Sequence, residues 1–425
     1  MRGFQSVQLS INLAAFRSRN YRLFFIGQSL SMIGTFMTQV AIAWLIYQLA
    51  NSAFLLGLTG FLGQFPTFAL APFSGVFADR WNRYRLLVLV QLVGTVLSFV
   101  LTILYALDQL NIPMLVLLST LAGLLRGLDV PVRQAFVIEM LESRDDLTSA
   151  IALNASLING ARLIGPAIAG ILIAAIGAGS CFLLDTLSYV VVTIMLLMMH
   201  IQSKPVTKTN QPILETLIDG FQYVRNCWPI RSILLLLASM SLMGLPYITL
   251  LPVFAVQMFG GNATTLGFLT AASGLGAFSA GVYLSTRRTV LGLGKLIAFS
   301  PMLLGSSLVL FSICKPFGLA LVLMAIAGFS SILQAASSNT LIQTIVDDNR
   351  RGRVMSFYAM SFMGMIPFGS LIAGSLANHI GASATVAIGG IACMIGSLMF
   401  LQQLPMMCSI LRPIYYQRGI LSRQA

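Results

Sequence analysis

The chain has 425 residues and a net charge of +13, and 57% of its residues are hydrophobic while only 9% are charged. Soluble domains carry about 25% charged residues, so this composition excludes a soluble globular protein. A net positive charge is also found in nucleic-acid-binding proteins. Here the charges stand in short segments between apolar runs rather than on one basic domain, which excludes that class.

The first half of the chain contains six apolar runs, each long enough for a helix that crosses a bilayer. About 20 apolar residues in a helix span about 30 Å of hydrocarbon. The predicted spans are 22–48, 53–76, 86–107, 112–139, 148–176 and 181–201. Together they predict an N-terminal six-helix bundle over residues 1–201.

Residues 202–231 change character and are predicted to form a cytoplasmic linker. A polar stretch comes first, and apolar residues from Ile213 to Val224 then recur at helical spacing opposite charged ones. This pattern predicts an amphipathic helix that lies on the membrane and ends near Pro229.

Six more apolar runs predict a C-terminal six-helix bundle with a basic tail over residues 232–425. The predicted spans are 232–258, 264–285, 295–314, 317–346, 354–378 and 384–404, and the predicted tail is 405–425.

The positive charges predict the orientation of these spans. Arg126 and Arg162 fall inside spans and Lys315 falls in an outer loop, while all other lysines and arginines lie in or next to the loops of one side. Cytoplasmic loops retain Lys and Arg, so both termini are expected in the cytoplasm.

An internal repeat indicates that the two halves correspond. Four glycines of the fifth span recur at one constant offset in the eleventh span: Gly160, Gly165, Gly170 and Gly177 match Gly364, Gly369, Gly374 and Gly381. At a second constant offset, Gly57 matches Gly267 and Arg85 matches Lys295. Repeated bundles of this kind are common in secondary transporters.

The turn between the second and third spans carries the clearest motif. Its key residues are Gly75, Asp79, Arg80, Arg83 and Arg85. Gly-x-x-x-Asp-Arg-x-x-Arg-x-Arg at this place resembles the signature loop of the major facilitator superfamily, with Asn82 where the family usually has glycine. The resemblance implies an all-α membrane protein with twelve transmembrane helices in two pseudo-symmetric six-helix bundles.

The same resemblance implies a conformational latch on the cytoplasmic side. Asp79 would cap the start of the eleventh span near Val354, and Arg83 would pair with an acid on the fourth span. A carboxylate is favourable at a helix N-terminus. The alternative is a simple turn with a few cations that face the lipid headgroups.

The fifth span contains a second motif, built on Gly160, Gly165, Pro166 and Gly170. It resembles the antiporter motif of exporters, shifted by one residue at its first glycine. Small residues at helical spacing allow close helix contact, and Pro166 removes a backbone hydrogen bond and allows a bend. The alternative is that this motif serves helix packing alone.

Charged residues of the fourth and fifth spans are further candidates. Arg126, Asp129 and Arg133 share one face of the fourth span, and Arg162 lies near the middle of the fifth. Charges inside a membrane face the bundle interior or a water-filled cavity, so Arg126 and Arg162 are expected near the central cavity. Asp129 either neutralises Arg126, Arg133 or Arg83 in a structural network or couples transport to protons.

Asp185, near the outer end of the sixth span, is a second candidate for proton coupling. The alternative, which the sequence favours, is a carboxylate solvated at the membrane interface.

Two further segments resemble the exporter branch of the superfamily that handles enterobactin and macrolides. They are Leu128 to Phe136, and Asn159 with Arg162 before the Gly-Pro pair. This implies a transporter, not an enzyme, in a bacterial inner membrane, and proton-driven export of an amphiphilic siderophore or drug. The expected lining of the substrate cavity is Gln28, Gln39, Arg126, Asn159, Arg162 and Gln334.

The expected partners are a small-molecule substrate, protons and the lipid bilayer, with no nucleic acid, cofactor or metal, and the chain is expected to be a monomer. No P-loop is present, so ATP is not expected to drive transport directly. Two alternatives stay open: a facilitator or importer of a lipid-like or nutrient substrate, such as lysophospholipid, and a membrane-embedded assembly protein without transport.

Overall fold

The computed structural model describes residues 14–80, 82–200, 213–287, 289–347 and 350–418, and this part contains helices and no strands. Twelve helical segments are long and apolar enough to cross a membrane. The prediction of an all-α membrane protein with twelve spans is confirmed.

The first six spans lie within a few residues of their predicted ranges. They are α1 (Arg19–Ala50), α2 (Ala53–Arg80), α3 (Arg83–Ala106), α4 (Ile112–Met140), α5 (Leu147–Ile176) and α6 (Gly179–Leu197), with short helical turns at η1 (Ala14–Arg17) and η2 (Arg144–Asp146). Asparagine side chains cap the N-termini of two of these helices, α3 and α4. The side chain of Asn82 accepts the backbone N–H of Arg85, and that of Asn111 accepts the N–H of Met114.

The predicted amphipathic helix is α7 (Ile213–Asn226), and it packs against α13 (Arg351–Phe362). Arg353 pairs with Asp219, and the ring of Phe221 lies 6.3 Å from that of Phe357. The helix ends at Asn226, close to the predicted end near Pro229. That proline lies in the first turn of α8 (Trp228–Ser239), where a missing N–H costs little.

The seventh predicted span is a composite of four pieces. After α8 come the π-helical turn η3 (Met240–Gly244), α9 (Tyr247–Val253) and a second π-helical turn η4 (Phe254–Met258). Such turns occur inside longer helices and often mark hinges or functional positions.

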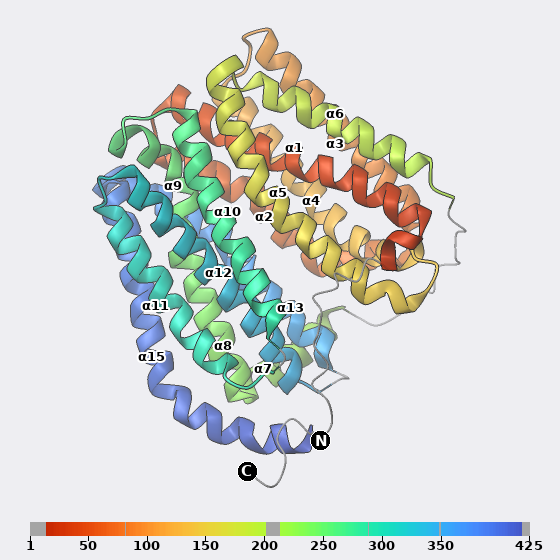
Figure 1. Cartoon of the computed structure of the whole chain (residues 1–425), viewed down its shortest axis with the longest axis vertical. Helices are drawn as coiled ribbons and strands as arrows, with labels where there is room; N and C mark the ends of the chain where they lie inside the picture. The colour runs from red at the N-terminus through yellow and green to blue at the C-terminus, as the bar shows by residue number, and fades with distance from the viewer. Residues whose placement is uncertain (1–13, 81, 201–212, 288, 348–349, 419–425) are drawn as a thin grey trace, which may run out of the picture.

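The remaining spans are α10 (Ala263–Thr286), α11 (Leu293–Ser312), α12 (Phe317–Ile345), the pair α13 and α14 (Met365–Ile380), and α15 (Ala382–Gln417). The eleventh span starts at Arg351 rather than near Val354 and is broken after Phe362. The predicted tail is also partly wrong, because α15 continues through Pro405 to Gln417. Figure 1 shows α15 bending as it leaves the other helices, as proline inside a helix allows.

Figure 1 shows how the helices are grouped: α1 to α6, from red to yellow, pack together, and α8 to α15, from green to blue, pack beside them. The groups meet where α5 packs against α10 and α2 packs against α14. The helices alternate in direction. One end of the protein therefore carries the loops at 51–52, 177–178 and 259–262, and is called here the Gly177 end. The opposite end, with Asn82 and the loop at 141–146, is called the Arg83 end.

The internal repeat read from the glycines is visible in the backbone. Gly177 ends α5 with φ 90° and ψ 165°, and its counterpart Gly381 ends α14 with φ 86° and ψ 157°. A positive φ of this size favours glycine. Equivalent positions in the two halves thus have equivalent conformations, which supports the pseudo-symmetry.

Candidate transport pathway

Two pairs of glycines join the two helix groups toward the Gly177 end. A Cβ on Gly170 of α5 would lie 2.8 Å from the Cα of Gly267 in α10, and a Cβ on Gly57 of α2 would lie 2.7 Å from the Cα of Gly374 in α14. Thr264 adds a hydrogen bond, since its hydroxyl donates to the carbonyl of Gly170 at 3.1 Å. The two pairs are repeats of each other, so the halves make the same contact twice.

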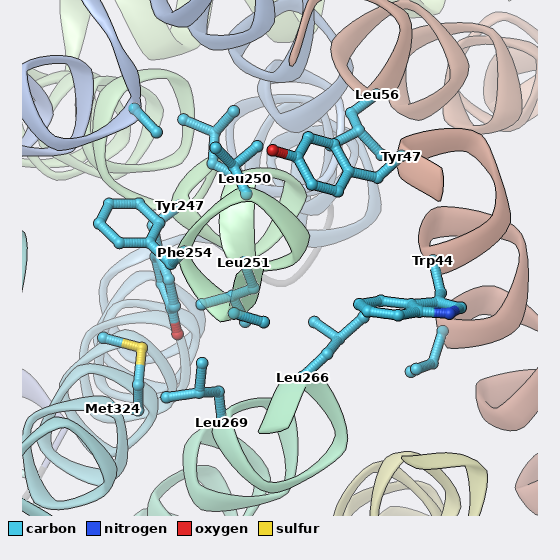
Figure 2. Close-up of a cluster of buried hydrophobic side chains, with 14 of the residues drawn as sticks. Trp44, Tyr47, Leu56, Tyr247, Leu250, Leu251, Phe254, Leu266, Leu269 and Met324 are labelled. Atoms are coloured by element: carbon cyan, nitrogen blue, oxygen red, sulfur yellow. The ribbon is translucent and has the colours of Figure 1, made fainter. Parts of the chain in front are cut away.

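Buried apolar side chains from both groups fill the space beside these contacts. Figure 2 shows labelled members of this cluster: Trp44, Tyr47, Leu56, Tyr247, Leu250, Leu251, Phe254, Leu266, Leu269 and Met324. They come from α1, α2, α9, α10 and α12 and from η4. The two halves are therefore sealed together at the Gly177 end.

An aromatic cluster continues the contact toward the middle of the spans. The ring of Phe368 in α14 lies 5.6 Å from that of Phe61 and 6.0 Å from those of Phe65 and Phe68 in α2. Edge-to-face pairs at such distances are favourable.

Arg162 lies where the two halves meet. Its guanidinium carbon is 5.9 Å from the ring centroid of Phe36 in α1, and it interacts electrostatically with Tyr247 of α9. The backbone carbonyl of Arg162 also packs against Gly274 of α10. Among the described residues, no carboxylate lies within 4 Å of this half-buried cation.

Arg126 is also inside its span and has no acidic partner within 4 Å in the described part of the chain. Its Nη2 donates to the carbonyl of Gly63 in α2 at 3.0 Å. Asp185 interacts with it electrostatically at longer range. Both intramembrane arginines that the sequence indicated are thus half-buried, and neither has a carboxylate within 4 Å among the residues that the structure describes.

Asp129 belongs to a local network. It pairs with Arg133 at 3.3 Å, one turn along α4, and accepts a hydrogen bond from Gln91 of α3 at 3.1 Å. Of the three partners that the sequence left open for Asp129, the structure selects Arg133. Because Arg133 is buried, this ion pair neutralises a charge that would otherwise be costly.

The turn motif is described only in part. Arg83 pairs with Glu139 of α4 at 3.0 Å, so the acid on the fourth span is Glu139. Arg85 is exposed. Gly75, Asp79 and Arg80 lie in α2, but the side chains of residues 71–80 are not described, and the latch itself stays a prediction.

The other candidates for the cavity are not brought together. Gln28 and Gln334 are buried, whereas Gln39 is exposed. The side chain of Asn159 donates to the carbonyl of Ala155 in its own helix. Among the described residues, none of these four has a hydrogen bond or ion pair with Arg126 or Arg162, so their predicted role in a common substrate site stays untested.

The glycine motif of α5 packs against two different helices, α1 and α10. A Cβ on Gly165 would approach Phe36 of α1 at 2.8 Å, and Gly170 faces α10, whereas a Cβ on Gly160 would meet nothing within 4 Å. Pro166 lies inside α5, which runs unbroken through it. Close packing thus accounts for two of these four residues.

For Asp185 the expectation of a solvated carboxylate is wrong. The residue is only 4% exposed and lies among α1, α3 and α6. Its Oδ2 accepts hydrogen bonds from the hydroxyls of Thr38 at 2.9 Å and Ser98 at 3.2 Å. The sequence position near a span end suggested exposure, but neighbouring helices cover the side chain. The burial of Asp185 could have been suspected from polar residues within otherwise apolar spans, such as Thr38 and Ser98.

In the described part of the chain, no three or more His, Cys, Asp or Glu side chains gather in a metal-binding arrangement. Among the described residues, the geometry offers two half-buried arginines without a carboxylate within 4 Å, the buried acid Asp185, and a sealed contact at one end. Such an arrangement suits binding and passage of a solute rather than covalent chemistry.

Comparisons with known proteins agree with this geometry. Residues 10–412 match the family model described as transmembrane secretion effector. The chain is 26% identical over 89% of its length to the staphyloferrin A transporter of Staphylococcus aureus, covering 95% of that protein. It is 22% identical to macrolide efflux protein A of Streptococcus pyogenes, with 86% and 91% of the two chains covered. It is 24% identical to the enterobactin exporter EntS of Shigella boydii, with 90% and 91% covered.

Solved structures show the same fold at low identity. The nucleoside transporter NupG superposes with a TM-score of 0.71 at 13% identity, covering 90% of this chain and 98% of that one. A bacterial homologue of the human lysosomal transporter Spinster, solved inward-facing and unoccupied, gives a TM-score of 0.64 at 15% identity, with 96% and 99% covered. The sequence match spans nearly the whole chain, and the fold is that of the major facilitator superfamily. The chain therefore belongs to the transmembrane secretion effector family, a multi-pass transporter family of that superfamily.

Proposed function

We propose that this chain exports an amphiphilic organic anion across a bacterial inner membrane, in exchange for protons and by alternating access. The favoured substrate class is an anionic or catecholate siderophore. The chain acts as a monomer, with residues 1–201 and 232–425 as its two moving halves, residues 202–231 as the linker and both termini in the cytoplasm.

The observation that carries this proposal is the position of Arg162. A cation at the junction of the two halves, with no carboxylate within 4 Å among the described residues, is a binding group for an anion. Its guanidinium carbon lies 5.9 Å from the ring of Phe36 in one half, and its backbone carbonyl packs against Gly274 of the other, which supports a role for Arg162 at the junction. Arg126 supplies a second cation, and in the described part of the chain it also has no carboxylate within 4 Å.

The named activities of the relatives support the substrate class. Two of them are named for the siderophores staphyloferrin A and enterobactin, and one is named for macrolides. An interior with two arginines but few acids favours an anionic siderophore over a cationic drug.

The distribution of positive charge supports the orientation. If the Arg83 end faces the cytoplasm, as the excess of Lys and Arg there favours, the sealed Gly177 end faces outward. In the conformation described here, the contacts at the Gly177 end then close the outward side of the protein. In the transport cycle the contacts at the Gly177 end separate while the Arg83 end closes.

Replacing Arg162 by alanine is expected to reduce siderophore secretion about tenfold or more, because a charge-assisted hydrogen bond contributes about 1.5–3 kcal/mol. Efflux of the cationic dye ethidium should fall much less. Secretion of enterobactin and of staphyloferrin A is measured in a strain that lacks its own siderophore exporters. Arg225→Ala, which removes an exposed arginine of α7, is the matched control and should change neither. Equal loss of siderophore secretion and dye efflux in Arg162→Ala would count against an anionic substrate.

A further inference from the structure

Asp185 has an environment that none of the transport contacts above explains. It lies in α6, away from the junction between the halves, and is 4% exposed. Its partners come from two other helices: Thr38 is in α1 and Ser98 is in α3. The hydroxyl of Ser98 is also within 3.3 Å of the carbonyl of Phe182, one turn before Asp185.

The two carboxyl oxygens of Asp185 are not equivalent. The hydroxyls of Thr38 and Ser98 both approach Oδ2, while Oδ1 is buried and has no hydrogen-bond partner among the described residues. The space beside Oδ1 is closed by Gly34 of α1, since a Cβ there would lie 2.7 Å from Oδ1 and 2.7 Å from the hydroxyl oxygen of Ser188. The hydroxyl of Ser188 is the donor on this side, and it bonds the backbone carbonyl of Asp185 at 2.7 Å, so Oδ1 is less well satisfied than Oδ2.

No cation neutralises this carboxyl group by direct contact. Among the described residues, none of the lysines, arginines or histidines lies within 4 Å of it. The charged and titratable groups that face it at longer range are Arg126 of α4 and Tyr189 and Cys181 of α6, and α1 and α3 contribute only hydroxyls. As an anion, Asp185 would be a buried charge without a counter-ion, which is costly inside a membrane.

Asp129 provides the contrast within the same half of the protein. It has an ion pair with Arg133 and a hydrogen bond from Gln91, so both of its oxygens have partners. Adding a proton to Asp129 would break an ion pair and leave Arg133 buried and unpaired. Adding a proton to Asp185 would remove an uncompensated charge. Of the two candidates for coupling, the structure favours Asp185.

We propose that Asp185 is the group that binds and releases the exchanged proton, and that Thr38 and Ser98 hold the carboxyl group in its ionised form during the cycle. This assignment rests on the proposed function, because it requires that transport is coupled to protons. Asp129 is then a permanently charged member of a structural ion pair. The proton on Asp185 is exchanged with water when the halves move and the contacts around α6 loosen.

Infrared spectroscopy of the purified protein in lipid nanodiscs tests proton binding without any substrate. A pH titration is expected to show the C=O band of a protonated carboxyl group, which is lost in Asp185→Asn. The control Asp108→Asn, at an exposed acid just after α3, should retain the band. A band that is unchanged in Asp185→Asn would overturn the assignment.

A flux measurement separates this assignment from the proposed function. In proteoliposomes, Asp185→Asn is expected to exchange labelled for unlabelled staphyloferrin A at the wild-type rate but to lose at least tenfold in accumulation driven by a pH gradient. Full pH-driven accumulation by Asp185→Asn would reject Asp185 while leaving the function intact. Absence of pH-driven transport in the wild type would reject proton coupling and this assignment together, whatever the infrared result.

A second variant keeps the test decisive if Asp185→Asn does not accumulate in membranes. Thr38→Val with Ser98→Ala retains the carboxyl group but removes both hydroxyl donors. The carboxyl band is then expected to move in frequency, because hydrogen bonding to the group has changed. A band at the wild-type frequency would contradict the assignment.

Discussion

Replacing Gly170 by leucine is expected to abolish transport and to separate the two halves at the Gly177 end. A Cβ at this position would lie 2.8 Å from the Cα of Gly267 and 2.9 Å from the carbonyl oxygen of Ala263, both backbone atoms of α10. Overpacking of this kind costs about 1–3 kcal/mol, which shifts a two-state equilibrium about 5- to 150-fold. The sealed conformation, in which we propose that substrate enters from the cytoplasm, would then be poorly populated.

Cysteine labelling measures this shift directly. Leu266 is 2% exposed within the cluster of Figure 2, so Leu266→Cys should react slowly with an impermeant maleimide in the wild-type background and rapidly in Gly170→Leu. The matched control is Gly160→Leu in the same helix, because a Cβ on Gly160 would meet nothing within 4 Å. Gly170→Leu protein that transports normally and protects residue 266 would show that this contact does not govern the cycle.

Asp79→Asn is also expected to abolish transport, while expression and membrane insertion stay near normal. We propose that Asp79 stabilises the conformation in which the Arg83 end is closed, by lying at the N-terminus of α13. A carboxylate in such a place contributes up to about 2 kcal/mol when partly buried, and a loss of this size shifts an equilibrium about 30-fold. The ion pair of Arg83 with Glu139 anchors the same turn to α4.

The control for Asp79→Asn makes the same acid-to-amide change at the same end of the protein. Asp145 is exposed in the loop between α4 and α5, so Asp145→Asn should transport normally. Export by whole cells and the amount of protein in the membrane are measured for both variants. Wild-type export by Asp79→Asn would reject the latch.

Much of the fold could be predicted from the sequence, because apolar runs separated by basic turns determine which segments cross a membrane. Interruptions within apolar runs could not be predicted. The stretch from Met240 to Gly244 forms a π-helical turn, yet it is as apolar as the helix before it. The eleventh span breaks after Phe362, with Gly364 and Pro367 just beyond, whereas α15 continues past Pro405 although proline disfavours a helix interior.

The candidate site was less predictable, because its contacts join residues that are far apart in the chain. The arginines inside the spans were found from their charge alone. The burial of Asp185 depends on Thr38 and Ser98, which come from two other helices. The repeat identified Gly170 and Gly374 as equivalent residues, but only the structure shows that each lies against a glycine of the opposite half.

Transport by the purified protein in proteoliposomes tests the central proposal most directly. Labelled staphyloferrin A or enterobactin is supplied on the side of the Arg83 end, and a pH gradient is imposed with the opposite side more acidic. We predict accumulation on the acidic side against the solute gradient, and its collapse when a protonophore is added. Flux that is indifferent to the pH gradient would indicate a facilitator, flux in the reverse direction an importer, and no flux of either siderophore would contradict the proposed substrate class.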